Sequence, residues 1–276
     1  MTPTTDRLAR LTLPLTAHGT RVEVSALYRP GTGTPLVFLH GFGATKEDYA
    51  DVVHQPALAD RPVLAYDAPG CGASTRADLD ALSVPFLVEV ARQVLRARRI
   101  DRFHVVGHSM GGLTAPLLAD ADPARIVSFT DIEGNLAPED RLLSRQIVTH
   151  ADDDPDTFLA RFAARVGASR HHGSALYASA LPHKVRAGAV RGIFASMVDL
   201  SDHGALLDRF LALPMPRTFM YGERNTSLSY LPALAEHGVE PAEISPCARF
   251  PMYSNAPETW SRITTTVTRA EAVTTT

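Results

Sequence analysis

The amino-acid sequence predicts an α/β protein with a mostly parallel sheet, and two features of the chain support this fold class. Short runs of consecutive apolar residues recur along the chain, as expected for strands that are buried on both faces. Patterns typical of amphipathic helices lie between these runs, and this alternation favours a parallel sheet covered by helices on both sides. With 276 residues, 45% of them hydrophobic, the chain is long and apolar enough for one large domain.

The first half of the chain contains most of the predicted elements. Two segments, LTLPLTAHG (11–19) and TRVEVSALYRP (20–30), predict a pair of strands joined by a turn at His18 and Gly19. The segment SVPFLVEVARQVLRARR (83–99) predicts a helix, because Ser83 is a favourable N-cap and the apolar residues after it share one face. Continuous apolar runs predict five further strands: PLVFLH (35–40), RPVLAYD (61–67), FHVVGH (103–108), RIVSFTD (125–131) and PRTFMYG (216–222).

Residues 135–213 interrupt this rhythm, since they contain helical patterns and no convincing strand. In DPDTFLARFAARVG (154–167), Asp154 is placed to cap a helix, Pro155 suits its first position and Gly167 ends it. An insert of about 80 residues is too long for a connecting loop. We therefore expect a helical cap over the carboxyl edge of the sheet, where open α/β folds bind their ligands.

The expected division of the chain follows from this insert. Residues 1–134 form the first part of the core, 135–213 the helical cap, and 214–276 the second part of the core. The last segment, TTTVTRAEAVTTT (264–276), is polar and lacks a helix cap, so we expect it to be disordered.

Composition excludes several classes of function. The net charge of −3, with charges mixed along the chain, argues against binding to nucleic acid or to an anionic membrane. Two cysteines, Cys71 and Cys247, form no disulfide framework. No signal-peptide pattern and no apolar run of 18 residues are present, so we expect a cytoplasmic protein that does not enter the membrane. No residue cluster has metal-ligand spacing, and we expect neither a metal nor another cofactor.

The strongest chemical motif is Gly107-His108-Ser109-Met110-Gly111, where a predicted strand runs directly into a helix. This is the G-x-S-x-G pattern in the strand–turn–helix context that makes it informative. The glycines allow a sharp turn, which would leave Ser109 exposed at the sheet edge with a helix N-terminus directed at it. The helix dipole there favours developing negative charge, so Ser109 is the predicted nucleophile.

A second motif, His40-Gly41-Phe42-Gly43, follows a buried strand. Glycines on either side allow a backbone N–H to turn toward the serine. We predict that the amides of Phe42 and Met110 form an oxyanion hole.

Together these motifs make the chain resemble the α/β-hydrolase superfamily. The segments HGFG, AYDAPGCGAS, GHSMGG, YGERN and FPMYSNAPETW occur in the family's order and span nearly the whole predicted core. The resemblance implies an α/β-hydrolase fold with a mostly parallel eight-stranded sheet and a helical lid inserted after the sixth strand. It also implies a nucleophile, an acid and a histidine in that chain order, acting on a carboxylic ester or lactone.

The acid is not where many members of the family have it. Their acid follows the seventh strand, but the matching position here is Asn225. In the subgroup that includes haloalkane dehalogenases and fungal-type lactone hydrolases, the acid follows the sixth strand, where this chain has FTDIEGN. We therefore predict Glu133 as the acid, with Asp131 as the second candidate and Glu223 as the third.

The position of the family's histidine is occupied by Arg249, in the segment ARFPMYSN (248–255). Arginine stays charged because its pKa exceeds about 12, so it cannot serve as a general base. Without a base, Ser109 is a poor nucleophile at neutral pH. Arg249 could instead form a bidentate pair with Glu133, or hold a carboxylate or enolate of a ligand.

Other histidines are candidates to replace the missing base. His40 and His108 belong to the loop motifs and are predicted to orient backbone, and His237 is predicted to lie at the opposite edge of the sheet. The remaining candidates lie in the expected cap, which could overhang the site: His171, His172, His183 and His203.

Two functions follow as alternatives. The first is a serine hydrolase for a small hydrophobic ester or lactone, impaired by the arginine at position 249. The second is a non-hydrolytic protein on the same fold that binds a small ligand or steers a cofactor-free rearrangement. The sequence does not indicate the substrate's identity or the oligomeric state.

Overall fold

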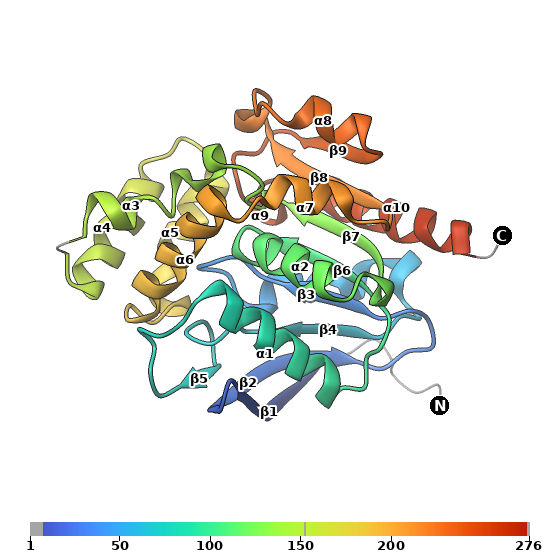
Figure 1. The fold of residues 1–276 in the computed structure, drawn as a ribbon, viewed down its shortest axis with the longest axis horizontal. Helices are drawn as coiled ribbons and strands as arrows, with labels where there is room; N and C mark the ends of the chain where they lie inside the picture. The colour runs from blue at the N-terminus through green and yellow to red at the C-terminus, as the bar shows by residue number, and fades with distance from the viewer. Residues whose placement is uncertain (1–7, 152, 275–276) are drawn as a thin grey trace.

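The computed structural model describes residues 8–151 and 153–274, and these residues form an α/β structure around one large sheet (Figure 1). Its strands follow the order β1-β2-β4-β3-β6-β7-β8-β9, and the short β5 pairs with β2. The ladder from β4 to β9 is parallel, whereas β1 and β2 run antiparallel to their neighbours. The predicted α/β fold with a mostly parallel sheet is confirmed, but the described sheet has nine strands and not the eight expected, because the two-residue β5 adds to β2. The strand bounds are β1 Ala9–Ala17, β2 Thr20–Arg29, β3 Leu36–Leu39, β4 Val63–Tyr66, β5 Thr75–Arg76, β6 Phe103–His108, β7 Ile126–Ile132, β8 Arg217–Gly222 and β9 Val239–Ile244.

The central strands formed where continuous apolar runs predicted them. Every residue of β3, β4, β6 and β7 is buried, because helices cover both faces of the sheet. The turn between β1 and β2 lies at His18 and Gly19, whose φ angles are 45° and 74°. Two positive φ angles match the right-handed twist of a two-residue hairpin, so this predicted turn is confirmed as well.

The last strand, β9, was not located by the sequence reasoning. It contains Pro241, which has no amide to donate to a ladder and which argues against a central strand. β9 pairs only with β8 and forms one end of the sheet, and an edge strand tolerates such a proline.

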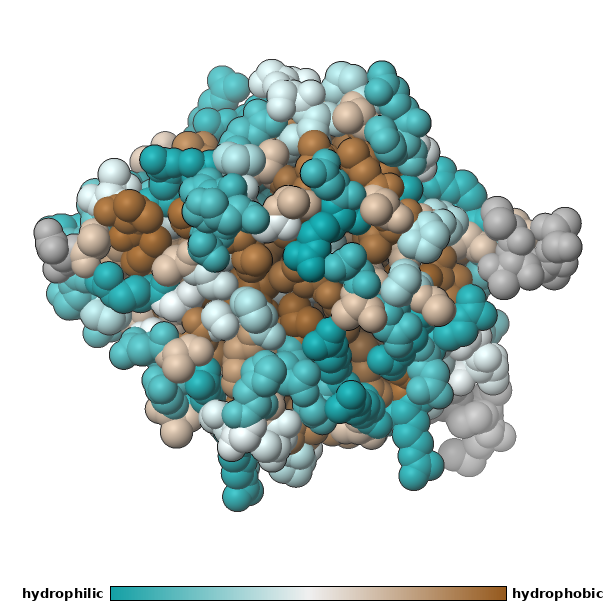
Figure 2. All heavy atoms as spheres, viewed as in Figure 1, coloured by the Kyte–Doolittle hydropathy of each residue, from teal (hydrophilic) through white to brown (hydrophobic). Residues whose placement is uncertain are grey.

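Helices cover the sheet in two layers (Figure 1). α1, α2 and α7 lie over one face, and α10 with the 3₁₀ helix η1 lies over the other. On the first face, apolar side chains are visible between helices whose outer surfaces are mostly polar (Figure 2). The helix bounds are α1 Val84–Ala97, α2 Met110–Ala121, α3 Gln146–Thr149, α4 Pro155–Gly167, α5 His172–Lys184, α6 Ala189–His203, α7 Leu206–Ala212, α8 Leu231–Glu236, α9 Pro251–Ser254 and α10 Ala256–Thr274. The 3₁₀ helices are η1 Lys46–His54, η2 Pro56–Leu58, η3 Pro123–Arg125, η4 Pro138–Leu142 and η5 Glu223–Asn225.

The segment between β7 and β8 is helical where the structure describes it. The helices α3 to α6 group together at one end of the sheet, at the left of Figure 1. α4 begins as predicted, with the Asp154 carboxylate accepting a hydrogen bond from the Thr157 amide at 3.0 Å. The last helix of the segment, α7, packs beside α2 on the sheet face. The assignment of residues 135–213 as a separate cap stays a prediction.

The chain's C-terminal segment differs from the prediction of a disordered tail. Residues 264–274 continue α10, and only 275–276 of the predicted tail lie outside the described residues. Trp260, Ile263, Val267 and Ala270 are buried on one face of the helix, with the first three packed against β7, β8 and β9. Their spacing of three or four residues is a helical period that the surrounding threonines concealed. No helix within the described ranges has the length and apolar composition needed to cross a bilayer.

We predict that α10 contributes substantially to stability. Replacing Ile263, which is 1% exposed, with alanine removes buried methyl and methylene groups and leaves a cavity. Ile263→Ala should lower the free energy of unfolding by about 2–5 kcal/mol. Urea unfolding measures the change. Thr268→Ala, at an exposed position of the same helix, is the matched control and should stay within about 0.5 kcal/mol. Equal midpoints for the two variants would contradict the packing of α10 on the sheet.

Candidate active site

Ser109 occupies a strained turn between β6 and α2, with φ 50° and ψ −111°. No side chain fits at the flanking glycines. A Cβ on Gly107 would lie 2.6 Å from the carbonyl oxygen of Gly111, and a Cβ on Gly111 would lie 2.0 Å from the carbonyl oxygen of Leu39. The Ser109 amide donates to the carbonyl of Ile132 at 2.9 Å, which ties the turn to the end of β7. The structure therefore has the sharp strand–turn–helix connection that the sequence predicted.

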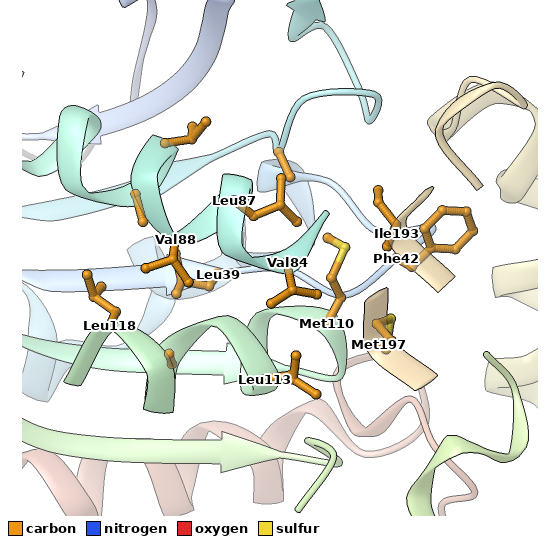
Figure 3. Close-up of a cluster of buried hydrophobic side chains, with 14 of the residues drawn as sticks. Leu39, Phe42, Val84, Leu87, Val88, Met110, Leu113, Leu118, Ile193 and Met197 are labelled. Carbon is orange, nitrogen blue, oxygen red and sulfur yellow. The ribbon is translucent and has the colours of Figure 1, made fainter. Parts of the chain in front are cut away.

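The two predicted oxyanion-hole residues lie on either side of this turn. Phe42 is in the loop after β3, and Met110 is the first residue of α2. Among the residues that the structure describes, neither amide donates to a protein acceptor. Both side chains are buried in apolar surroundings, Phe42 beside Ile193 and Met110 beside Val84 (Figure 3). Their side chains are thus anchored, and their N–H groups are left free for another acceptor.

A side chain of α5 contacts the loop that carries Phe42 and holds it in place. The Tyr177 hydroxyl donates to the Phe42 carbonyl at 2.9 Å. Gly43, with φ 79°, lies so close to this tyrosine that a Cβ would be 2.4 Å from its hydroxyl oxygen. A side chain at position 43 would therefore displace either the loop or the helix.

A small cavity of about 20 Å³ lies over Ser109. Helices α4, α5 and α6 supply one side of it, and the loops after β3 and before α9 supply the other. Most of its walls are apolar, with Arg249 as the charged exception. The lining residues are Phe42, His108, Ser109, Leu143, Ser144, Phe162, Tyr177, Phe194, Met197, Arg249 and Phe250.

Glu133, the first candidate for the acid, is buried just after β7 with φ 53°. Its Oε1 accepts a hydrogen bond from the Gly222 amide at 2.6 Å, and its Oε2 accepts one from the Asn225 side chain. Arg249 Nε lies 4.0 Å from Oε2. Burial raises the pKa of Glu133 to about 7, although the Arg249 cation and the two hydrogen bonds act in the opposite direction.

The contact between Glu133 and Arg249 is not the bidentate pair that the sequence suggested. Both carboxylate oxygens are already engaged, by Gly222 and by Asn225. Arg249 therefore approaches one oxygen at a long distance and keeps most of its donors free of Glu133. Asn225 occupies the family's usual acid position and here supports the carboxyl group instead.

The other two candidate acids lie elsewhere. Asp131 is fully buried between Gly112 and Gly134, and neither of its oxygens accepts a hydrogen bond. Burial raises the pKa of Asp131 well above its ordinary value. Glu223 is partly exposed and accepts a hydrogen bond from Ser245 Oγ at 3.1 Å. Of the three carboxylates, only Glu133 forms an ion pair with Arg249 in the part of the chain described.

The sequence reasoning missed a third buried carboxylate in this region, Asp140. It accepts hydrogen bonds at 2.8 Å from the amides of Leu136 and Ala137, and from the Tyr230 hydroxyl. Burial raises its pKa. The one available signal was the position of Asp140 three residues after Ala137 at the start of η4, which is typical of a capping carboxylate.

The histidines of the two motifs orient backbone, as expected. His40 uses both ring nitrogens, Nδ1 on the Gly41 carbonyl at 2.8 Å and Nε2 on the Ala68 amide at 2.8 Å. His108 Nε2 contacts the Arg249 carbonyl at 3.1 Å and so fixes the backbone of the loop before α9. Burial lowers the pKa of His108 to about 4, which keeps it neutral.

No other histidine of the described chain lines the cavity over Ser109. His237 lies at the opposite edge, where its carbonyl accepts a hydrogen bond from Arg217 at the start of β8. His171 is 4.0 Å from Glu223, and His203 contacts Asp199 on the surface. Substitution of a cap histidine for the missing base therefore has no geometric support. A search of the described residues finds no group of His, Cys, Asp and Glu placed to hold a metal ion.

Comparisons with known proteins agree with this architecture. A family model described as the alpha/beta hydrolase fold matches residues 34–171, which is half of the chain. The chain is similar to the dihydrolipoyllysine-residue acetyltransferase component of the acetoin cleaving system of Pseudomonas putida, at 40% identity over 103 residues (36% of this chain and 26% of that protein). It is also similar to the proline iminopeptidase of Heyndrickxia coagulans, at 33% identity over 111 residues (40% and 38%). The chain spans less than two fifths of the length of these relatives.

Among solved structures, a carboxylesterase structure from Nitrososphaera gargenis superimposes with a TM-score of 0.75 at 13% identity. The match covers 95% of this chain and 99% of the other. At this level of identity the likeness shows the fold alone.

The burial of Glu133 predicts a pH-dependent stability. Because the folded pKa of about 7 lies above the ordinary value of 4.5, the stability contributed by the protonated carboxyl group is present at low pH and is lost as the pH rises through 7. Glu133→Gln cannot ionise. Its free energy of unfolding should therefore rise relative to that of the original protein between pH 5 and 8, by on the order of 3 kcal/mol.

Urea unfolding at several pH values tests this expectation. Glu223→Gln is the matched control, since Glu223 is more exposed, and it should change the pH profile less. A constant difference between the original protein and Glu133→Gln would mean that burial does not penalise the Glu133 carboxylate.

Proposed function

Since the chain belongs to the α/β hydrolase fold family, we propose that Ser109 is the nucleophile of a serine hydrolase for carboxylic esters or lactones. One observation carries the proposal. Ser109 is held in a strained turn at the N-terminus of α2, beside two amides, of Phe42 and Met110, that have no protein acceptor in the described chain. This arrangement suits a hydroxyl that attacks a carbonyl and a backbone that receives the resulting oxyanion.

In this mechanism Ser109 Oγ attacks the carbonyl carbon of the bound ester. The carbonyl oxygen becomes an oxyanion and accepts hydrogen bonds from the Phe42 and Met110 amides, while the α2 dipole favours the negative charge. Collapse of the tetrahedral intermediate expels the alcohol and leaves an acyl-serine. Attack by water on the acyl group then releases the acid and restores Ser109.

Attack by Ser109, expulsion of the alcohol and attack by water each need a group that accepts or donates a proton. Arg249 cannot be this group. Its guanidinium stays charged, so it does not take the proton of Ser109 during attack. Glu133 would orient a histidine at position 249, but it has no base to orient in this chain. An oxyanion hole without the remaining machinery leaves about 10³–10⁴-fold catalysis over the reaction in water. We therefore propose slow hydrolysis by the chain as it stands.

A second candidate function is ligand binding without hydrolysis. It is favoured by the position of Arg249, whose cation lines the cavity over Ser109 where a base would be needed. Slow hydrolysis of a p-nitrophenyl ester that is lost in Ser109→Ala would support the hydrolase, and equal rates for the two proteins would support binding alone. A fluorophosphonate probe reports whether a group other than Arg249 activates Ser109. A serine that is activated by some other group reacts rapidly, whereas an unassisted serine reacts slowly or not at all.

Restoring a histidine at position 249 tests the hydrolase proposal. Arg249→His should raise kcat/KM for a short p-nitrophenyl ester by about 10²–10⁴-fold, because a base then lies between Glu133 and Ser109. The gain should vanish in the double variant that also carries Ser109→Ala.

Arg249→Gln is the matched control, because it removes the cation without supplying a base. An equal gain in Arg249→Gln would attribute the effect to loss of charge. High activity of the original protein, with no gain in Arg249→His, would show that the base has been placed wrongly.

A further inference from the structure

A second and larger cavity, of about 270 Å³, adjoins the cavity over Ser109. The two share three walls: Leu143, Arg249 and Phe250. α4 and the segment that follows it form one side of the larger cavity, and η5 with the loop before α9 forms the other. No function assigned above uses this space.

Three arginines line this larger cavity, Arg165, Arg224 and Arg249, and none of its lining residues in the described part of the chain is an aspartate or glutamate. Within the described ranges, neither Arg165 nor Arg224 forms an ion pair, and the one pair of Arg249 is the 4.0 Å contact with Glu133. The nearest acidic neighbour in sequence, Glu223, is directed to Ser245 and His171 instead. Among the described residues, the long contact with Glu133 is therefore the one ion pair formed by these three arginines.

Arg165 has a guanidinium nitrogen that lacks a hydrogen-bond acceptor among the described residues. Its Nε donates to Gln146 Oε1 at 2.5 Å, which fixes the orientation of the guanidinium. Its Nη2 is buried and has no acceptor in the described chain. A buried donor without an acceptor is costly. Arg61, Arg76, Arg98 and Arg141 also have such donors, but among the described arginines with one, Arg165 is the one that lines this cavity.

We propose that this cavity binds the carboxylate of the substrate, so that the ligand is an anionic ester or lactone whose acyl group reaches Ser109. This inference rests on the proposed function for the position of the ester group. Guanidinium groups hold a carboxylate through paired hydrogen bonds, which would satisfy Arg165 Nη2 and neutralise the cluster.

The other walls favour a carboxylate on a short carbon chain over a phosphate. Val166, Ala168, Leu143 and Phe250 are apolar and suit the carbon chain of such a ligand, and the polar residues Gln146, Ser169 and Ser174 also line the cavity. Arg249 and Phe250 line both cavities. In one bound molecule, the ester would therefore lie in the cavity over Ser109 and the carboxylate in the larger cavity beside it. A half-ester of a short dicarboxylic acid has this chemistry.

A hollow beside the larger cavity is also lined by positively charged side chains. Arg224 also lines a neighbouring hollow together with Arg170 and His171. A positive rim attracts anions and raises their local concentration, which supports anionic ligands over neutral ones.

The first test measures binding and needs no turnover. In the Ser109→Ala protein, calorimetry compares glutarate monomethyl ester with its neutral dimethyl ester. The monoester should bind about tenfold more tightly, and Arg165→Gln and Arg224→Gln should each remove most of this preference while leaving diester binding unchanged. Arg161→Gln is the matched control on the same helix, because Arg161 is exposed, is paired with Asp153 and lies outside the cavity. Circular dichroism checks that each variant is folded.

Two results of this test would overturn the inference. Equal affinity for the monoester and the diester would do so, as would unchanged preference in both arginine variants. Tighter binding of inorganic phosphate than of the monoester would assign the cavity to phosphate and overturn the choice of carboxylate.

A second test separates this inference from the proposed function. In Arg249→His, kcat/KM for the monoester and diester is compared with and without Arg165→Gln. Preferred monoester binding without any turnover would overturn the hydrolase proposal and leave the anion site intact. Ser109-dependent turnover with no preference for the monoester would overturn the anion site alone.

Discussion

The close approach of the backbone at the end of β3 to the first turn of α2 is the constraint on which the site depends. Gly111 lies so near the Leu39 carbonyl that even a methyl group would not fit between them. This contact holds the end of β3 against the first turn of α2. It thereby keeps the Phe42 loop beside the Met110 amide and leaves Ser109 with a positive φ. One tight contact between strand and helix places the hydroxyl and both amides together.

The electrostatics around position 249 follow from how Glu133 is held. Gly222 and Asn225 donate hydrogen bonds to its two oxygens, and burial raises its pKa to about 7. Near neutral pH the carboxyl group is therefore only partly ionised and only partly neutralises the charge of Arg249. Arg249 is consequently bound only loosely by Glu133 and keeps donors for another anion. The same hydrogen bonds would hold Glu133 in place beside a histidine at position 249. The proposed hydrolase site and the proposed anion site therefore both depend on how Glu133 is held.

The sequence predicted the parts of this structure in which local pattern and tertiary role agree. Strands buried on both faces have continuous apolar runs, and the turn at Ser109 is marked by glycines that the backbone contact requires. β9 and the end of α10 were missed because Pro241 and a run of threonines obscure them, and only packing against the sheet resolves the ambiguity. The arginine cluster could not be predicted, since Arg165 and Arg224 are far apart in the chain and neither belongs to a motif.

In the two proposals, binding of the substrate carboxylate and proton transfer from Ser109 require different residues at position 249. A histidine at position 249 would accept the proton of Ser109 but, when neutral, would remove one of the three cations from the larger cavity. An arginine strengthens the proposed carboxylate site and removes the base. Glu133 does not replace the missing base. Its oxygens accept hydrogen bonds from Gly222 and Asn225, and its ion-pair partner in the described chain is Arg249. Under the proposed function and the proposed anion site, a chain with Arg249 is therefore better suited to holding an anionic ester than to cleaving it, and its slow cleavage would depend on the turn at Ser109 and its two amides alone.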